Sequence, residues 1–185
     1  TRPLTVDPQY VNKLKEKRFD EIAPCTRCLH CHFDYDEDGK VYEHCRVNAA
    51  TQRAYRELMP EGDIPLPAET ARKVMVIGGG PAGLEAARIA AERGHSVTLY
   101  EKKGVLGGLL SFANAVKGPH ENLEDFRKYL VRQQELKNVK VVLNTEVTSE
   151  MIKKEAPDAV ILAVGGARPT LGLSASSKTN VISIE

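Results

Sequence analysis

Apolar residues gather into four short runs in the second half of the chain, and each run has the length of a β-strand. The runs are Lys73–Ile77, Ser96–Tyr100, Val139–Leu143 and Ala159–Val164. The first is continuously apolar after its opening lysine, which is typical of a strand buried on both faces of a parallel sheet. We therefore expect a parallel sheet of at least four strands.

Three helices are predicted around these strands. Ala82–Arg93 links the first two strands, and Pro119–Leu136 places its apolar side chains near one helical face, which we interpret as packing. A shorter amphipathic helix follows Asp7 and Pro8, an acidic cap and a proline at the first helical position. The alternation of strands and helices predicts an α/β fold.

A glycine-rich turn, Gly78–Gly83 with the sequence GGGPAG, joins the first strand to the helix that follows it. Such a pattern is weak evidence alone, but between a strand and a helix it is the fingerprint of a Rossmann-like dinucleotide fold. Gly78 permits the tight turn, Gly80 lets the backbone approach a pyrophosphate, and Gly83 allows the helix to pack closely on the strand.

Further candidate contacts for a nucleotide flank this turn. Pro81 and Ala82 open the helix, whose first backbone N–H groups are available to phosphates. Glu101 ends the second strand and is expected to accept hydrogen bonds from the ribose hydroxyls. Its carboxylate would repel a 2′-phosphate, so we expect the ADP moiety of FAD, of NAD or of ADP itself. The next stretch is rich in glycine, and its backbone can come close to a flat cofactor. The remaining candidate contacts are Lys102, Gly107 and Gly108.

All four cysteines lie near the start of the chain, in the spacing C-x-x-C-x-x-C followed by one more thiol. Three thiols at steps of three residues can wrap one loop around the corners of a cube, which favours a 4Fe-4S cluster. The predicted ligands are Cys25, Cys28, Cys31 and Cys45.

Other uses of this segment fit less well. A structural zinc also takes four thiolates, or mixes them with nearby histidines such as His30, but zinc sites usually come as two separated C-x-x-C pairs. Disulfides need an oxidising compartment. The acidic turn Asp34–Gly39 imitates a calcium loop, yet Cys45 stands where a bidentate Glu is required, which favours a solvated hairpin. Zinc stays open as the main alternative.

Composition and charge exclude several classes of function. The 185 residues carry 26 basic and 25 acidic side chains, for a net charge of +1, so nucleic acid is not an expected partner. No apolar stretch approaches the roughly 20 residues that span a bilayer. We expect a cytoplasmic protein without a membrane segment. The Thr1 start and the strand-like ending at residues 180–185 both indicate a piece of a longer chain.

With these motifs the chain resembles the iron–sulfur flavoenzymes of the old yellow enzyme group, a family that includes 2,4-dienoyl-CoA reductase and trimethylamine dehydrogenase. The likeness spans nearly the whole chain. Thr1–Leu4 is similar to the end of the family's flavin-bearing barrel, Ala23–Cys45 to its 4Fe-4S loop, and Val76–Glu101 to its second nucleotide domain. Gly107-Gly108 and Ala163-Val164-Gly165 match later landmarks of that domain.

The resemblance implies a division of the chain into four parts. Residues 1–20 would be the tail of an FMN-binding TIM barrel, with Arg2 on the FMN phosphate. Residues 21–59 would hold the cluster, residues 60–71 would form a proline-rich linker, and residues 72–185 would be an FAD-binding domain that is incomplete at its C-terminal end.

The resemblance also implies a function. NADH or NADPH would reduce FAD, electrons would pass through the cluster to FMN, and FMN would reduce an activated carbon–carbon double bond in a small molecule. This chain would be the relay and inactive alone, with the barrel and NADH-binding domains of the same polypeptide as partners; a homo-oligomer is left open. Two alternatives remain: the ADP-binding structural domain of a trimethylamine dehydrogenase-like enzyme, and a non-catalytic connector holding zinc and ADP.

Overall fold

The computed structural model describes residues 2–33, 45–51 and 65–166. Three regions named above lie outside the described residues: the acidic turn 34–39, the first part of the linker at 60–64, and the ending 180–185. The rest of the linker, residues 65–71, forms neither helix nor strand, as its prolines predict.

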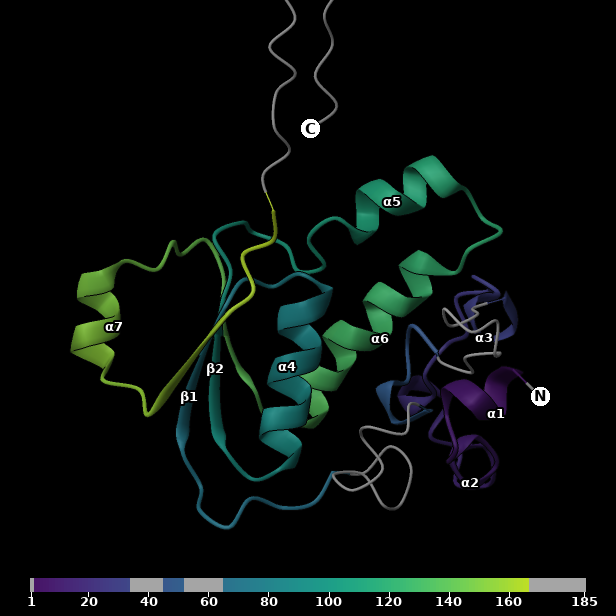
Figure 1. Cartoon of the computed structure of the whole chain (residues 1–185), viewed down its shortest axis with the longest axis horizontal. Helices are drawn as coiled ribbons and strands as arrows, with labels where there is room; N and C mark the ends of the chain where they lie inside the picture. Colours follow the sequence, from purple (N-terminus) through teal and green to yellow (C-terminus); the bar gives the residue numbers. More distant parts are fainter. Residues whose placement is uncertain (1, 34–44, 52–64, 167–185) are drawn as a thin grey trace, which may run out of the picture.

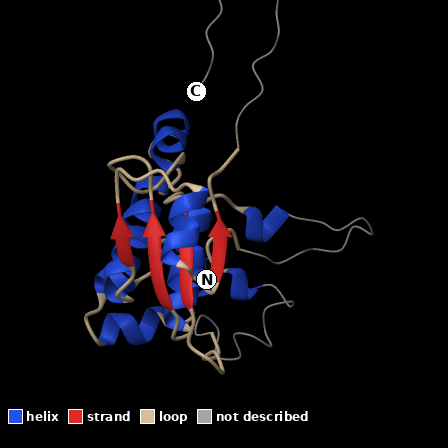
Figure 2. Cartoon of the chain, turned by 90° about the vertical axis from the view of Figure 1, so that its left-hand side faces the viewer, coloured by secondary structure: helices blue, strands red, loops and turns tan. Residues whose placement is uncertain are grey.

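Four parallel strands form the centre of residues 65–166 (Figure 2). They are β1 (Lys73–Ile77), β2 (Ser96–Tyr100), β3 (Lys140–Val142) and β4 (Ala159–Leu162), in the order β3-β2-β1-β4. This arrangement confirms the predicted α/β fold with a parallel sheet. Since β1 has β2 on one side and β4 on the other, the chain switches direction at β1. In open parallel sheets, ligands bind at the carboxyl ends of the strands beside such a switch.

The last two strands are shorter than their apolar runs predicted. β4 ends at Leu162, which pairs with Ile77 at the end of β1. Ala163 still donates its N–H to the Ile77 carbonyl at 2.8 Å, but β1 turns away at Gly78, and the ladder stops there. A run of apolar residues therefore overestimates a strand where the neighbouring strand ends first.

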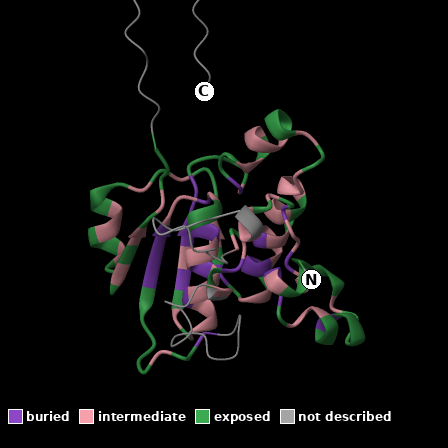
Figure 3. Cartoon of the chain, turned by 45° about the vertical axis from the view of Figure 1, so that its right-hand side comes forward, coloured by how far each residue is buried: buried purple, intermediate pink, exposed green. Residues whose placement is uncertain are grey.

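Helices cover the two faces of the sheet unequally (Figure 1). Helices α4 (Pro81–Glu92) and α6 (Leu123–Leu136) pack on one face, and α7 (Ser149–Glu155) lies on the other side. The buried core lies between the first pair and the strands (Figure 3). Its fully buried side chains include Val76, Leu84, Ala87 and Leu99, with Leu130 only 1% exposed. Gln134 of α6 is also buried and donates its side-chain N–H to the Leu84 carbonyl at 2.9 Å, which joins α6 to α4.

Helix prediction was correct for α4 and α6 but missed two helices that lie around the sheet, α5 (Leu110–Lys117) and α7. The predicted segment from Pro119 begins as helix only at Leu123, and α5 precedes it as a separate helix. Gly118 ends α5 with a φ of +70°, which separates the two helices. α7 was also missed, although Thr148 caps it by accepting a hydrogen bond from the Met151 N–H at 3.3 Å.

The first 51 residues contain short elements. They are α1 (Arg2–Val6), α2 (Tyr10–Lys15), α3 (His30–Phe33) and two 3₁₀ turns, η1 (Phe19–Glu21) and η2 (Ala49–Thr51). The helix expected after Pro8 is present as α2, but Asp7 does not cap it, because Gln9 occupies the cap position. Asp7 is instead buried at the centre of this segment. Among the described residues, no helix is long and apolar enough to cross a membrane.

Candidate cofactor-binding sites

The glycine turn is shaped by close contacts at its two ends. Gly78 has a φ of +108°, and a side chain there would collide with the carbonyl of Ala163, the residue after β4. A methyl group on Gly83 would collide with the carbonyl oxygen of Gly78 itself. The steric roles expected of both glycines, a tight turn and close helix packing, are therefore present. The turn leaves little freedom for any other residue at either position.

The glycine turn has open space beside Gly80. Gly80 caps α4 with an ordinary φ of −75°, and a methyl group added to it would have the Gly108 Cα, at 3.9 Å, as its nearest neighbour. Pro81 and Ala82, the first residues of α4, are exposed. A backbone that is open at a helix N-terminus can accommodate a pyrophosphate. The nucleotide contacts assigned to these three residues remain predictions.

A second glycine loop forms the wall opposite Gly80. Gly107 donates its N–H to the Gly79 carbonyl at 2.7 Å and has a φ of +117°. A methyl group on Gly108 would lie 2.9 Å from the Gly80 Cα, so the two loops touch backbone to backbone. The expectation that this stretch can approach a cofactor closely agrees with its position beside the turn.

Arg127 of α6 supports this second loop from behind. Its Nη1 donates to the Leu106 carbonyl at 3.2 Å, and its aliphatic stem fills the space where Gly107 has no side chain. Glu124, one turn earlier, accepts two hydrogen bonds from the guanidinium, at 2.7 and 2.8 Å. These bonds raise the pKa of Arg127 and lower the pKa of Glu124. Sequence reasoning treated α6 as packing only and missed this role.

Glu101 is buried at the end of β2, and both of its carboxylate oxygens are engaged. Oε2 accepts from the Gly79 N–H at 2.7 Å, and Oε1 accepts from the Lys103 N–H at 2.8 Å. The carboxylate predicted to meet the ribose therefore also holds the glycine turn. Lys102 is exposed, and its predicted contact with the nucleotide remains a prediction.

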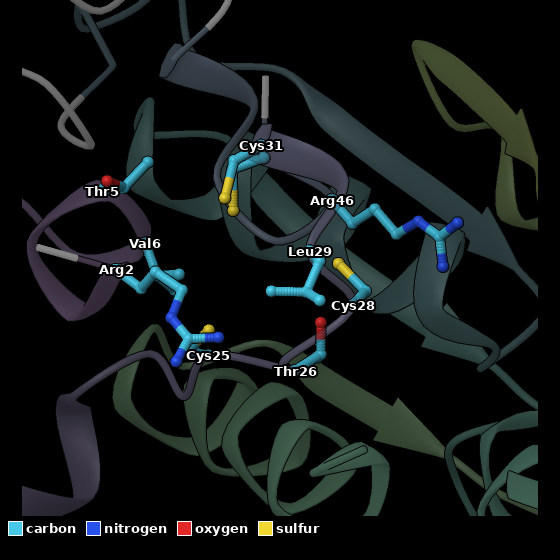
Figure 4. Close-up of a pocket in the computed structure, with 10 residues that line it drawn as sticks. Arg2, Thr5, Val6, Cys25, Thr26, Cys28, Leu29, Cys31 and Arg46 are labelled. Atoms are coloured by element: carbon cyan, nitrogen blue, oxygen red, sulfur yellow. The ribbon is translucent and has the colours of Figure 1, made fainter. Parts of the chain in front are cut away.

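The four cysteines are brought together around one hollow (Figure 4). Each is a free thiol and half-buried. The four residues are Cys25, Cys28, Cys31 and Cys45. The backbone turns left-handed at Arg27 and Leu29, with φ near 56° and 59°, which wraps the chain around the hollow. Arg2 of α1 also lines the hollow, beside Cys25 in Figure 4. Its predicted contact with an FMN phosphate remains a prediction.

Two of the sulfur atoms already accept backbone hydrogen bonds. The N–H of Arg27 points to the Cys25 sulfur and the N–H of Val47 to the Cys45 sulfur, each at 3.4 Å. Burial raises the pKa of the Cys45 thiol, and the neighbouring Cys28 and Cys31 raise it further, while backbone N–H groups oppose the shift. Burial and neighbouring thiols therefore favour the neutral thiol until an ion or cluster compensates the charge.

The donor set fits an iron–sulfur cluster. Within residues 2–33, 45–51 and 65–166, no three His, Cys, Asp or Glu side chains are already arranged to hold a metal ion. The thiols nevertheless line one hollow, and backbone N–H groups directed at ligand sulfurs are a common feature of iron–sulfur sites. Four thiols also fit zinc, so the geometry by itself leaves the metal open.

Three residues that sequence reasoning did not identify hold the cysteine segment. Asp7, 1% exposed, accepts from the Lys13 ammonium and from the N–H of Ala23, each at 2.9 Å. Thr51 accepts from the Cys45 N–H at 2.9 Å. Asn122, just before α6, donates its side-chain N–H to the Cys25 carbonyl at 3.1 Å. Asn122 lies 97 positions from Cys25, and Asp7 reads as an ordinary helix cap, so local patterns carried no signal for these two contacts.

Comparison with known proteins places the chain in a family. The model of the pyridine nucleotide-disulphide oxidoreductases matches residues 72–184. Cinnamate reductase from Clostridium sporogenes is 37% identical over 182 residues, which cover 96% of this chain and 25% of that protein. NADH oxidase from Thermoanaerobacter brockii is 37% identical over 186 residues, covering 97% and 27%. The chain thus spans about a quarter of the length of these curated relatives.

Solved structures of similar proteins have the same fold. A 2-naphthoyl-CoA reductase in complex with 2-naphthoyl-CoA has a TM-score of 0.79 and 36% identity, over 92% of this chain and 25% of that one. Histamine dehydrogenase from Rhizobium sp. 4-9 shares the fold, with a TM-score of 0.75 at 24% identity over 96% and 25%. The curated relatives are named as a reductase and an NADH oxidase, which agrees with the oxidoreductase family that the motifs predicted, and the chain therefore belongs to the pyridine nucleotide-disulphide oxidoreductase family.

Proposed function

We propose that this chain is the electron-relay portion of an NAD(P)H-dependent flavin and iron–sulfur oxidoreductase. The glycine turn would hold the ADP moiety of FAD, and the cysteine hollow would hold a 4Fe-4S cluster. An FMN in a separate barrel domain of the same polypeptide would receive the electrons. One observation carries the proposal: four free thiols line a single hollow in a chain that also presents an open glycine turn at a helix N-terminus.

The residues of this chain hold and orient these groups. When bound, FAD takes an electron pair from a nicotinamide, and an iron–sulfur cluster passes electrons singly to the next centre. Gly80 leaves room for the pyrophosphate, and Glu101 accepts from the ribose. The N–H groups of Arg27 and Val47 donate to the ligand sulfurs and thereby stabilise their negative charge.

The names of two relatives support the proposed substrate class. The names of two similar proteins state reduction of cinnamate and of 2-naphthoyl-CoA, which supports an activated carbon–carbon double bond as the reduced group. The substrate itself would bind in the barrel domain, so the full reaction needs the remaining domains as partners.

Anaerobic purification of the chain, with metal and flavin analysis of one sample, tests the proposal. We expect a brown protein with about four irons per chain and FAD released on denaturation. Stoichiometric zinc in a colourless protein would support the connector alternative, and ADP in place of FAD would support the structural-domain alternative. Cys28→Ser is the matched variant, because it removes one ligand and leaves the glycine turn unchanged. It should lose iron and retain nucleotide.

The proposed electron transfer from FAD to FMN is tested in the full-length enzyme. Cys28→Ser should abolish NADH-dependent reduction of the barrel flavin and leave NADH-dependent reduction of FAD unchanged. Normal reduction of FMN in this variant would rule out the relay.

A further inference from the structure

One helix contacts both candidate sites. Asn122, the residue that precedes α6, donates its side-chain N–H to the Cys25 carbonyl in the cysteine segment at 3.1 Å. Arg127, in the second turn of the same helix, donates to the Leu106 carbonyl in the second glycine loop at 3.2 Å. The two contacts therefore start five residues apart on α6 and end at different cofactor sites.

The contact at Arg127 continues to the nucleotide turn. Its guanidinium is fixed by two hydrogen bonds to Glu124, so the side chain has little freedom to move away from the loop. Its stem packs against Gly107, and Gly107 in turn donates to the Gly79 carbonyl at 2.7 Å. Ordering of the first turns of α6 would consequently also order the wall that faces Gly80.

The C-terminal half of α6 is anchored in the protein core. Leu130 is 1% exposed in the core, and Gln134, equally buried, donates to the Leu84 carbonyl of α4 at 2.9 Å. Because the backbone hydrogen bonds of an α-helix resist local bending, ordering at Asn122 also restricts Arg127 about one turn later. Asn122 and Arg127 are thus parts of one rigid element.

We propose that α6 couples the occupancy of the two sites, with Asn122 and Arg127 as positioning residues. The inference rests on the function proposed above. Without a cluster, the loop that carries Cys25 depends on left-handed backbone at Arg27 and Leu29 and has no regular structure. A cluster fixes the Cys25 carbonyl, so the Asn122 contact no longer carries the entropic cost of ordering the loop. Cluster loading therefore tightens nucleotide binding, and nucleotide reciprocally stabilises the cluster.

Calorimetric titration of ADP into the full chain tests this coupling. ADP is the probe because it meets the glycine turn and carries no flavin ring. The affinity is measured anaerobically in the cluster-loaded and the cluster-stripped chain. We expect the loaded chain to bind ADP about fivefold more tightly, the factor that corresponds to one neutral hydrogen bond gained. In Asn122→Ala the ratio should fall to about one while ADP and iron both still bind.

Two further variants show whether a change in the affinity ratio is specific to the proposed coupling. Arg127→Met keeps an apolar stem against Gly107 but removes the bond to Leu106. The ratio of the two ADP affinities should therefore also fall to about one in this variant, which tests the coupling even if Asn122→Ala folds poorly. Arg132→Ala is the control, because Arg132 joins the same helix to Asp20 at 2.8 Å, outside both sites. It should keep the wild-type ratio.

The outcomes separate the coupling from the proposed function. A wild-type ratio of one, or a fivefold ratio that survives in both Asn122→Ala and Arg127→Met, overturns the coupling while iron and ADP binding leave the function standing. A wild-type chain that takes up no iron, or binds no ADP, overturns the proposed function and the coupling with it.

Discussion

The glycine turn and the cysteine segment are held by different physical means. The turn joins a strand and a helix of the sheet core, and its conformation is imposed by backbone contacts at Gly78 and Gly83. The cysteine segment has only short helices and 3₁₀ turns among its described residues, and separate polar contacts hold it. Asp7 is the most buried of these. The glycine turn is therefore preorganised by packing, whereas the cysteine hollow depends on a few side chains and, in our proposal, on the cluster that it binds.

The difference has consequences for folding and for loading. A site made by packing forms with the sheet, before any ligand arrives. A site made by point contacts keeps part of its ordering cost until the ligand is bound, as is common for metal-binding segments. α6 connects the two kinds of site, because it packs in the core of one and reaches the other through Asn122.

Asp7→Ala should give the largest effect, because it removes a buried carboxylate from a buried ammonium and from the Ala23 N–H. Removing one partner of a buried ion pair costs about 3–5 kcal/mol. Urea denaturation should show that loss of unfolding free energy, together with reduced iron content. Glu155→Ala is the control, since its pair with Lys73 is exposed at the surface. A loss no greater than that of the control would show that the segment does not depend on Asp7.

Glu101→Ala should have the next largest effect, on the nucleotide site. The Gly79 N–H loses its acceptor, and a bound ribose loses a charge-assisted hydrogen bond of about 1.5–3 kcal/mol. ADP affinity, measured by calorimetry, should fall at least tenfold. Glu101→Gln keeps one acceptor oxygen and should lie between the variant and the wild type. Unaltered affinity in Glu101→Ala would contradict the assigned role.

Gly83→Ala and Gly80→Ala should separate folding from binding within one turn. The Gly83 methyl group would collide with the Gly78 carbonyl and separate α4 from β1, at about 1–3 kcal/mol of unfolding free energy. The Gly80 methyl group meets no atom of the described chain closer than 3.9 Å, so stability should change little while ADP affinity drops. Equal stability losses in the two variants would mean that the turn is not shaped by packing as described.

Arg132→Ala should have the smallest effect. Its bond to Asp20 of η1, at 2.8 Å, lies outside both sites, and both side chains are exposed. Exposed ion pairs contribute little to stability because water screens them. The urea midpoint and iron content should both match the wild type. A clear fall in either value would mean that exposed ion pairs, and not Asp7 alone, stabilise the cysteine segment.

Local sequence patterns predicted the elements that depend on local chemistry. β1 and β2 match their apolar runs residue for residue, and α4 begins one residue before the prediction. Gly78 and Gly83 were assigned correct steric roles because a strand, a turn and a helix in that order admit few geometries. The ends of β4 and α6 were less accurate, since one depends on where β1 stops and the other on the turn at Gly118.

The parallel sheet, the glycine turn and the set of four thiols could be predicted from the chain alone, because each depends on residues that lie close together in sequence. Three features became visible only in the folded chain: Asp7 is a buried anchor and not a helix cap, Glu101 holds Gly79, and α6 contacts both sites. These contacts join residues up to 97 positions apart. No local pattern encodes such a pair, since what brings it together is the packing of α4, α6 and the sheet into one core.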